Sequence, residues 1–171
     1  MTLKMSMSVN DPLKEEIKRF MRSFPQGVTL VTTRRNGRIL GITISSFTSL
    51  SLNPPLVLIA ISKDATSHDD FVECEFFDVQ LLGANQDDVA KKFAKKIDHD
   101  EKFRDLSYSF DSNGSPIIDG ALGSLECSKY QVHDVGDHSL ILGKVEKARM
   151  LRDDSLPLVY HNRKFTTISS K

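Results

Sequence analysis

The sequence contains no tryptophan, only two cysteines and no excess of charge of either sign. Lysine and arginine together number 23, as do aspartate and glutamate, so the formal net charge is zero. A neutral chain has no general electrostatic attraction to polyanions, so we expect no nucleic-acid binding and no attachment to a membrane surface. Cys74 and Cys127 are too few for a disulfide framework and lack metal-ligand spacing, so we expect two free thiols in a reducing cytoplasm.

Long apolar runs are also missing. The N-terminus lacks the apolar core of a signal peptide, and the longest mostly apolar stretch, Leu56–Ile61, is far too short to cross a bilayer. The 171 residues contain no internal repeat, low-complexity block or linker rich in Pro, Gly or Ser. We therefore expect one domain over residues 1–171, with residues 1–10 frayed, in a protein located in the cytoplasm.

Two helices are predicted. The first begins at Pro12, because proline is tolerated in the first turn of a helix, and it ends before Pro25. The second spans Gln86–Lys96, with Asn85 as its N-cap. Apolar residues at helical spacing place Leu13, Ile17, Phe20 and Met21 on one face of the first helix.

Strands and turn signals make up most of the remaining sequence. Asn36-Gly37 between two apolar runs is a strong hairpin signal, and Leu56–Ile61 is apolar on both faces, as expected of a central strand. Asp134-Val135-Gly136-Asp137 joins two long strands. Mostly antiparallel strands with few βαβ units indicate a mainly β barrel carrying peripheral helices, and not a doubly wound nucleotide-binding fold. The predicted strands are Val28–Thr33, Ile39–Ile44, Leu56–Ile61, Phe76–Leu82, Ala121–Val132, Ser139–Met150, Leu158–His161 and Phe165–Ile168.

Residues 41–55, with the sequence GITISSFTSLSLNPP, are the segment best suited to bind a ligand. Six hydroxyl side chains lie among the nine residues from Thr43 to Ser51. Small hydroxyl residues let the backbone approach a planar ligand, and their O–H groups both donate and accept hydrogen bonds. A flavin needs such donors at its ring oxygens, at N5 and around its phosphate. The alternative is a Ser/Thr-rich strand and turn whose hydroxyl groups bond only to nearby backbone.

Four segments in order along the chain resemble the flavin reductase-like family: GVTLVTT, GITISSFTSLSLNPPLVL, GDH and PLVYHNRKF. The resemblance runs from about Phe20 to Phe165 and is strongest to the reductase components of two-component 4-hydroxyphenylacetate 3-monooxygenases. It implies an FMN-binding split barrel, antiparallel and Greek-key-like, with peripheral helices. It also implies a homodimer that binds flavin beside the subunit interface.

The same resemblance assigns individual contacts, with alternatives left open for three residues. Lys63 is either a phosphate ligand or a solvated surface lysine, His138 either reaches the nicotinamide or is an exposed turn residue, and Phe71 either packs over the flavin or belongs to the core. Val28, Thr29, Leu30 and Val31 would line one side of the isoalloxazine ring. The ring and its side chain would contact Thr43, Ser45, Ser46 and Phe47. The phosphate would be approached by Ser49, Ser62, Lys63 and Ser67.

The activity implied by the resemblance is reduction of FMN or FAD by NAD(P)H, with the reduced flavin passed to a partner monooxygenase. Hydride moves from nicotinamide C4 to flavin N5, and the two cofactors carry that chemistry, so we expect no catalytic acid or base and no metal site. The sequence has no G-x-G-x-x-G motif for a Rossmann crevice. It also shows no arginine cluster matched to a ribose phosphate, which favours NADH over NADPH.

Three other functions remain open at this point. The first is an FMN-binding electron carrier of the same fold, which passes electrons to a protein partner. The second is an enzyme like pyridoxamine-phosphate oxidase, although its basic phosphate-binding pattern is not visible. The third is a structural barrel without a ligand.

Overall fold

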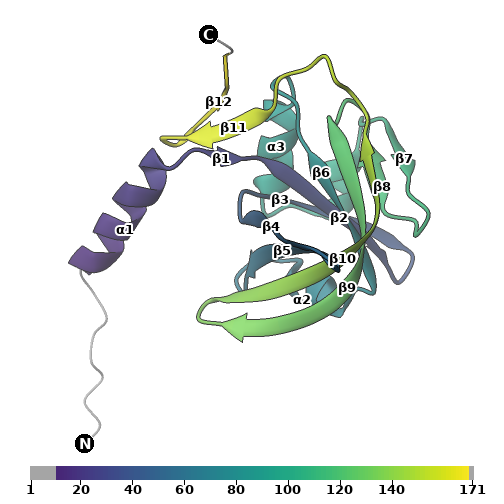
Figure 1. Cartoon of the computed structure of the whole chain (residues 1–171), viewed down its shortest axis with the longest axis horizontal. Coiled ribbons are helices and arrows are strands. Elements are labelled where there is room, and N and C mark those ends of the chain that lie inside the picture. Colours follow the sequence, from purple (N-terminus) through teal and green to yellow (C-terminus); the bar gives the residue numbers. More distant parts are fainter. Residues whose placement is uncertain (1–10, 170–171) are drawn as a thin grey trace, which may run out of the picture.

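A seven-stranded antiparallel sheet forms the body of the protein, which the computed structural model describes from residue 11 to residue 169 (Figure 1). The expected fraying of residues 1–10 lies outside the described residues. The strands follow the spatial order β3-β2-β6-β9-β10-β5-β4. Their bounds are β2 Thr29–Arg35, β3 Arg38–Ile44, β4 Phe47–Leu52, β5 Pro55–Ser62, β6 Phe76–Leu81, β9 Gly123–Val135 and β10 His138–Met150.

The sheet curls into a barrel because its two edge strands are consecutive in the sequence. β3 and β4 lie at opposite ends of the strand order, yet only Ser45 and Ser46 connect them. The backbone N–H of Ala60 in β5 donates to the carbonyl oxygen of Ser46 at 3.1 Å, which holds this connection against the far side of the sheet. The barrel is therefore split between β3 and β4, and the hydroxyl-rich segment lies at the split. The mainly β, antiparallel split barrel predicted from the sequence is confirmed.

Two hydrophobic clusters lie on opposite faces of β2, because successive side chains of a strand alternate between the two faces of the sheet. Val31 points into the barrel, where it packs with Ile59, Phe77 and other residues of the interior cluster. Leu30 points outward into a second cluster, which includes Phe93 of α3 (Asp87–Ala94). The barrel wall is thus buried on both sides along β2.

The predicted strands agree with the structure except at their ends. The hairpin at Asn36-Gly37 is present, with φ values of 52° and 78°. β5 lies between β10 and β4, second from the edge of the sheet. The predicted four-residue joint between the two long strands is wrong: β9 and β10 continue until only Gly136-Asp137 separates them, and Gly136, at φ 59°, supplies the left-handed turn.

The second predicted helix is shorter than expected, and its predicted cap is wrong. α3 spans Asp87–Ala94, and Gln86 instead of Asn85 is the residue before it. The Gln86 side chain accepts from Gly83 N–H at 2.9 Å and donates to the Asp119 carbonyl at 3.1 Å. Gln86 thus fastens the start of α3 to two neighbouring loops. Two further short helices are α2 His68–Glu73 and α4 His99–Phe103.

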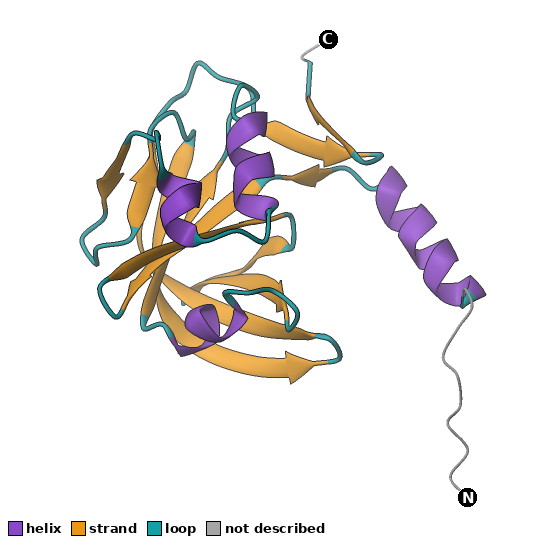
Figure 2. Ribbon diagram, turned by 180° about the vertical axis from the view of Figure 1, so that it is seen from behind, coloured by secondary structure: helices purple, strands orange, loops and turns teal. Residues whose placement is uncertain are grey.

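The first helix, α1 Pro12–Ser23, forms as predicted, with Asp11 as N-cap accepting from Leu13 N–H at 3.1 Å. The predicted apolar face stays exposed in the single chain, because α1 projects away from the barrel (Figures 1 and 2) and buries none of its residues. Phe20 is 71% exposed and Ile17 53%. An amphipathic pattern predicts which face of a helix is apolar, but it does not identify the surface against which that face packs.

A small second sheet joins the two ends of the described chain. The C-terminal hairpin of β11 (Leu158–His161) and β12 (Lys164–Thr167) pairs with β1 (Gln26–Gly27), which directly follows α1. A separate two-stranded sheet is formed by β7 (Tyr108–Phe110) and β8 (Pro116–Ile118). Within the described residues, no helix is long and apolar enough to span a membrane.

Candidate functional site

A pocket of about 450 Å³ lies outside the barrel wall, between the end of β3, α3 and the C-terminal hairpin. We call it the α3 pocket. It contains three residues predicted to contact flavin, Val28, Thr43 and Ser45. The complete lining is Val28, Thr43, Ile44, Ser45, Lys91, Ala94, Lys95, Tyr160 and Phe165.

Close packing against β3 fixes the position of α3 at this pocket. A Cβ atom on Gly41 would lie 2.5 Å from Cε1 of Phe93, so only glycine allows the helix to approach this strand so closely. The hydroxyl of Thr43 donates to the carbonyl oxygen of Ala90 at 2.8 Å and ties the same two elements together. Lys91 lies in the last turn of α3 and Lys95 is its C-cap residue, and both line the pocket.

The opposite wall is aromatic. Tyr160 of β11 and Phe165 of β12 are cross-strand partners with ring centroids 5.2 Å apart. The Lys91 ammonium lies 5.9 Å from the Phe165 ring centroid, within the range of a cation–π contact. The hairpin therefore supplies flat apolar surface beside a positive charge.

The charges at the pocket are positive. Lys91 Nζ lies 2.6 Å from Asp87 Oδ2, and this hydrogen bond raises the pKa of Lys91 and lowers that of Asp87. Lys95 forms no salt bridge within the described part of the chain. An apolar and aromatic wall, two hydroxyl groups and two ammonium groups are the features that a planar, polar and anionic ligand requires. The donor set therefore fits a flavin.

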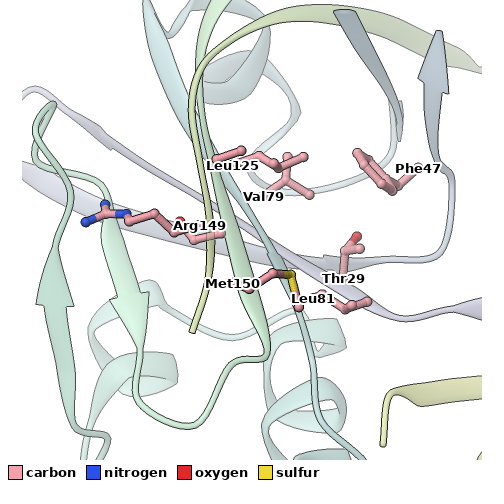
Figure 3. A pocket seen from close by; sticks show the side chains of 10 residues that line it. Thr29, Phe47, Val79, Leu81, Leu125, Arg149 and Met150 are labelled. Atoms are coloured by element: carbon pink, nitrogen blue, oxygen red, sulfur yellow. The ribbon is translucent and has the colours of Figure 1, made fainter. Parts of the chain in front are cut away.

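Thr29 and Phe47, also predicted flavin contacts, lie instead in a pocket of about 320 Å³ lined mainly by apolar side chains (Figure 3). We call it the barrel pocket. Its other side chains include Val79 and Leu125 from the barrel interior. The Thr29 hydroxyl donates to the Ile44 carbonyl at 3.0 Å, and Ile44 lines the α3 pocket, so the two pockets lie on either side of the β2–β3 pair. Side chains alternate from Val28 into β2, so Thr29 and Val31 face the barrel interior, whereas Val28 and Leu30 face outward.

A third group of predicted residues gathers where β5 ends and β10 begins. Ser62 and His138 are cross-strand partners, and Lys63 N–H donates to the Asp137 carbonyl at 2.9 Å. Lys63 Nζ lies 3.8 Å from Asp134 Oδ1, so this lysine is held at the tip of the β9–β10 hairpin. The His138 side chain is 43% exposed, with its Nδ1 2.7 Å from Asp137 Oδ1, and this contact lowers the pKa of Asp137. Ser67 is buried nearby at the start of α2.

The remaining predicted residues line neither the α3 pocket nor the barrel pocket. Leu30, Val31 and Phe71 are fully buried, so they can only support the walls from behind. The Ser46 hydroxyl donates to the Ala60 carbonyl at 2.6 Å, and Ser49 is exposed on the outer strand β4. Phe71 belongs to the interior cluster.

Sequence reasoning missed six residues of the α3 pocket: the apolar Ile44 and Ala94, and four residues that supply its charge and its aromatic wall. Lys91 and Lys95 are ordinary members of a predicted lysine-rich helix in the sequence, and only their spacing of four residues relates them to each other. Tyr160 and Phe165 belong to the closing segment PLVYHNRKF, which carries the resemblance, but no contact was assigned to them. Within residues 11–169, no group of three His, Cys, Asp or Glu residues could hold a metal ion.

Comparison with known proteins gives concordant results. The family model described as "Flavin reductase like domain" matches residues 21–169. The chain is 37% identical over 134 residues to FMN reductase (NADH) SmoA of Agrobacterium fabrum, covering 78% of this chain and 75% of that protein. It is 38% identical over 132 residues to the reductase component of flavin-dependent trigonelline monooxygenase from Acinetobacter baylyi, and spans 77% of this chain but only 42% of that protein's length.

The fold is also shared with a solved structure. The crystal structure of the flavin reductase HpaC complexed with NADP+ superposes with a TM-score of 0.86 and 38% sequence identity, over 92% of this chain and 99% of that chain. The resemblance inferred from four short segments thus extends over nearly the whole described chain.

Proposed function

Because the chain belongs to the flavin reductase-like family, we propose that it is an NAD(P)H-dependent flavin reductase that supplies reduced flavin to a partner monooxygenase. The observation that carries this proposal is the α3 pocket, where two hydroxyl residues of the split segment meet an aromatic wall and two lysines. The related SmoA is named an FMN reductase (NADH), and the Acinetobacter baylyi protein is named the reductase component of a flavin-dependent monooxygenase.

The protein's contribution to the reaction is positional. A bound flavin accepts hydride from a nicotinamide, and this chemistry belongs to the two ligands. The aromatic pair Tyr160 and Phe165 offers one face against which a ring can stack. The Ser45 hydroxyl forms no hydrogen bond within the described chain and is available to a ring oxygen or nitrogen. Lys91 and Lys95 favour the added negative charge of a reduced ring.

The residues at the β5–β10 end complete the proposal. Ser62, Lys63 and Ser67 would approach the flavin phosphate, and His138 would hydrogen-bond the nicotinamide carboxamide. Asp137 supports this role because its contact with Nδ1 leaves the other ring nitrogen of His138 for a ligand. FMN or FAD would be the flavin and NADH the donor.

A homodimer is part of the proposal, since α1 and β4 are incompletely covered in the single chain. Leu50 and Leu52 of the edge strand β4 are 47% and 90% exposed, and the apolar face of α1 is exposed as well. Exposed apolar residues of this kind favour association. In a two-fold dimer the same apolar surfaces of both subunits would be buried at the interface.

The partner would be the oxygenase component of a two-component monooxygenase, of the 4-hydroxyphenylacetate type. Cys74 and Cys127 are both free and buried, which is consistent with a reducing cytoplasm.

The proposal is tested by following NADH oxidation with and without added FMN, FAD or riboflavin, and by repeating the assay with NADPH. We expect oxidation only when flavin is present. Flavin-independent oxidation, or none with any flavin and either donor, would contradict it.

A further inference from the structure

Lys102 of α4 is a buried lysine that the proposed function has not used. It is only 2% exposed. Its Nζ donates to the carbonyl oxygen of Phe93 at 3.2 Å and to that of Gly41 at 3.5 Å, and it forms no salt bridge with any residue from 11 to 169. Burial lowers its pKa. An ammonium group buried without a carboxylate is costly, so its retention calls for a reason beyond packing.

The position of Lys102 is fixed by the buried face of α4, which consists of His99, Lys102 and Phe103. This face packs on Gly41 of the edge strand β3, whose N–H donates to His99 Nδ1 at 3.3 Å. The Phe103 ring meets the Phe93 ring edge to face, with centroids 4.9 Å apart. Burial, and then the charge of Lys102, lower the pKa of His99 to about 4, so the imidazole is neutral at pH 7. Lys102 is therefore the cation of this face.

The contacts of Lys102 place its ammonium group behind the α3 pocket. Phe93, which accepts from it, lies two residues before Lys95 of the pocket lining. Gly41, its other acceptor, lies two residues before Thr43, so the two residues share one face of β3, and Thr43 also lines the pocket. The ammonium group thus joins the two elements that form the pocket, on their buried side.

A buried cation acts on a ligand differently from the two lysines of the pocket lining. The Lys91 side chain is 53% exposed and paired with Asp87, and Lys95 is exposed as well. Water and salt screen such charges, whereas a buried charge is screened much less. Addition of a hydride makes a flavin ring more negative. A fixed cation close to the ring therefore stabilises the reduced form more than the oxidised form.

We propose that Lys102 is a fixed positive charge that makes the α3 pocket bind reduced flavin more tightly than oxidised flavin. This inference rests on the proposed function, which places the flavin ring in this pocket. The competing role is purely structural, because a cation that bonds the Phe93 carbonyl also caps the C-terminal end of α3. A cap would affect the binding of both redox states equally, whereas a charge affects mainly the reduced one.

The test uses two variants that remove the charge. Lys102→Gln keeps N–H donors for the carbonyl groups, and Lys102→Met removes the donors as well. The control is Lys92→Gln, because Lys92 Nζ also donates to a backbone carbonyl, that of Arg104 at 2.6 Å, but does not line the pocket. Calorimetry under anaerobic conditions measures the affinity for oxidised FMN and for dithionite-reduced FMN. Urea unfolding confirms that each variant is folded.

We expect both variants to lower the preference for reduced over oxidised FMN about tenfold, which corresponds to roughly 1.4 kcal/mol, with no change in the control. In the parent, the preference should persist in about 1 M KCl, because salt screens the exposed lysines but not a buried one. This measurement decides the question even where a variant does not fold. An unchanged preference in Lys102→Gln, or a parent preference that disappears in salt, would overturn the inference.

The binding measurements need neither NADH nor turnover, so they separate this inference from the proposed function. A protein that prefers reduced FMN but oxidises no NADH would contradict the proposed function alone. An active reductase whose preference does not depend on Lys102 would overturn the inference alone.

Discussion

Ser45 and Ser46 are adjacent serines at the split of the barrel, yet their hydroxyl groups have different surroundings. Ser46 donates to the Ala60 carbonyl and so fastens the β3–β4 connection to β5. Ser45 lines the α3 pocket and makes no hydrogen bond within the described chain. The sequence alone does not distinguish these two situations, since both residues have the same side chain and lie next to each other in one Ser/Thr-rich segment. The structure therefore assigns a structural role to Ser46 and leaves Ser45 as the candidate ligand contact.

Replacing Ser45 by valine should weaken flavin binding two- to tenfold, because one hydrogen bond worth about 0.5–1.5 kcal/mol is lost. Fluorescence quenching of FMN and FAD measures the change. Ser46→Val is the matched control: it should lower the free energy of unfolding by about 1 kcal/mol and leave the flavin affinity of the folded protein unchanged. Equal flavin affinity for Ser45→Val and the parent would remove Ser45 from the site.

Asp78 is a buried carboxyl group on the outer face of the sheet. Its Oδ2 accepts from the Ser124 hydroxyl at 2.6 Å, and its Oδ1 has no hydrogen-bond partner among residues 11–169. Burial raises its pKa from an ordinary 3.8 to about 7, with the Ser124 hydrogen bond opposing the shift. The folded protein therefore holds a proton that the unfolded chain releases above about pH 4. Stability associated with this group is full below pH 4 and is lost as the pH rises toward 7.

Asp78→Asn removes this titration, so its stability relative to the parent should increase with pH between 4 and 7, by at most about 1.4 kcal/mol per pH unit. Urea unfolding at several pH values measures the difference. The variant must be compared with the parent at each pH, because His99 also titrates in this range. Burial lowers the pKa of His99 to about 4, so its contribution to stability changes with pH in the opposite direction. Asp154→Asn, at a 77% exposed side chain, is the control. A pH-independent difference for Asp78→Asn would show that this carboxyl does not titrate in the window.

At the scale of elements, the two long helices show which features a sequence pattern can and cannot supply. The proline at its first turn and the apolar spacing correctly predict α1, because both depend on residues within the helix. Ile17 and Phe20 are exposed in the described chain, and the pattern within the helix cannot say what would cover them. For α3, Asn85 is a good N-cap by residue type. The structure uses Gln86 for contacts with Gly83 and Asp119, and Asp119 lies 33 residues away and is therefore invisible to a local rule.

Phe20→Glu places a charge on the exposed apolar face of α1 and should dissociate the proposed dimer. Light scattering should change from about twice the 19.2 kDa chain mass to the mass of one chain. Arg19→Glu introduces the same side chain one residue away on the polar face, and it should leave the mass unchanged. A dimer that persists in Phe20→Glu would place the interface elsewhere, with β4 as the next surface to change.

At the scale of the whole molecule, the barrel and the importance of the hydroxyl segment could be predicted from the sequence, whereas the pockets could not. Strand alternation, the Asn36-Gly37 turn and the order of the motifs are local or sequential signals. The α3 pocket combines Ser45 with Lys91 and Tyr160, and only the closure of the barrel brings these residues together. The preference for NADH over NADPH was predicted because no arginines cluster along the linear sequence. In the fold, Arg22 and Arg163 line one pocket although 140 residues separate them.

The most direct measurement of the central claim is an anaerobic titration that counts how many moles of flavin each mole of protein reduces. The protein is mixed with a hundredfold excess of FMN or FAD and an equal excess of NADH, and the loss of oxidised flavin absorbance is followed to completion. A reductase that treats flavin as a substrate should reduce essentially all of the added flavin. Reduction that stops at about one flavin per chain would contradict the account and indicate an electron carrier that retains its flavin.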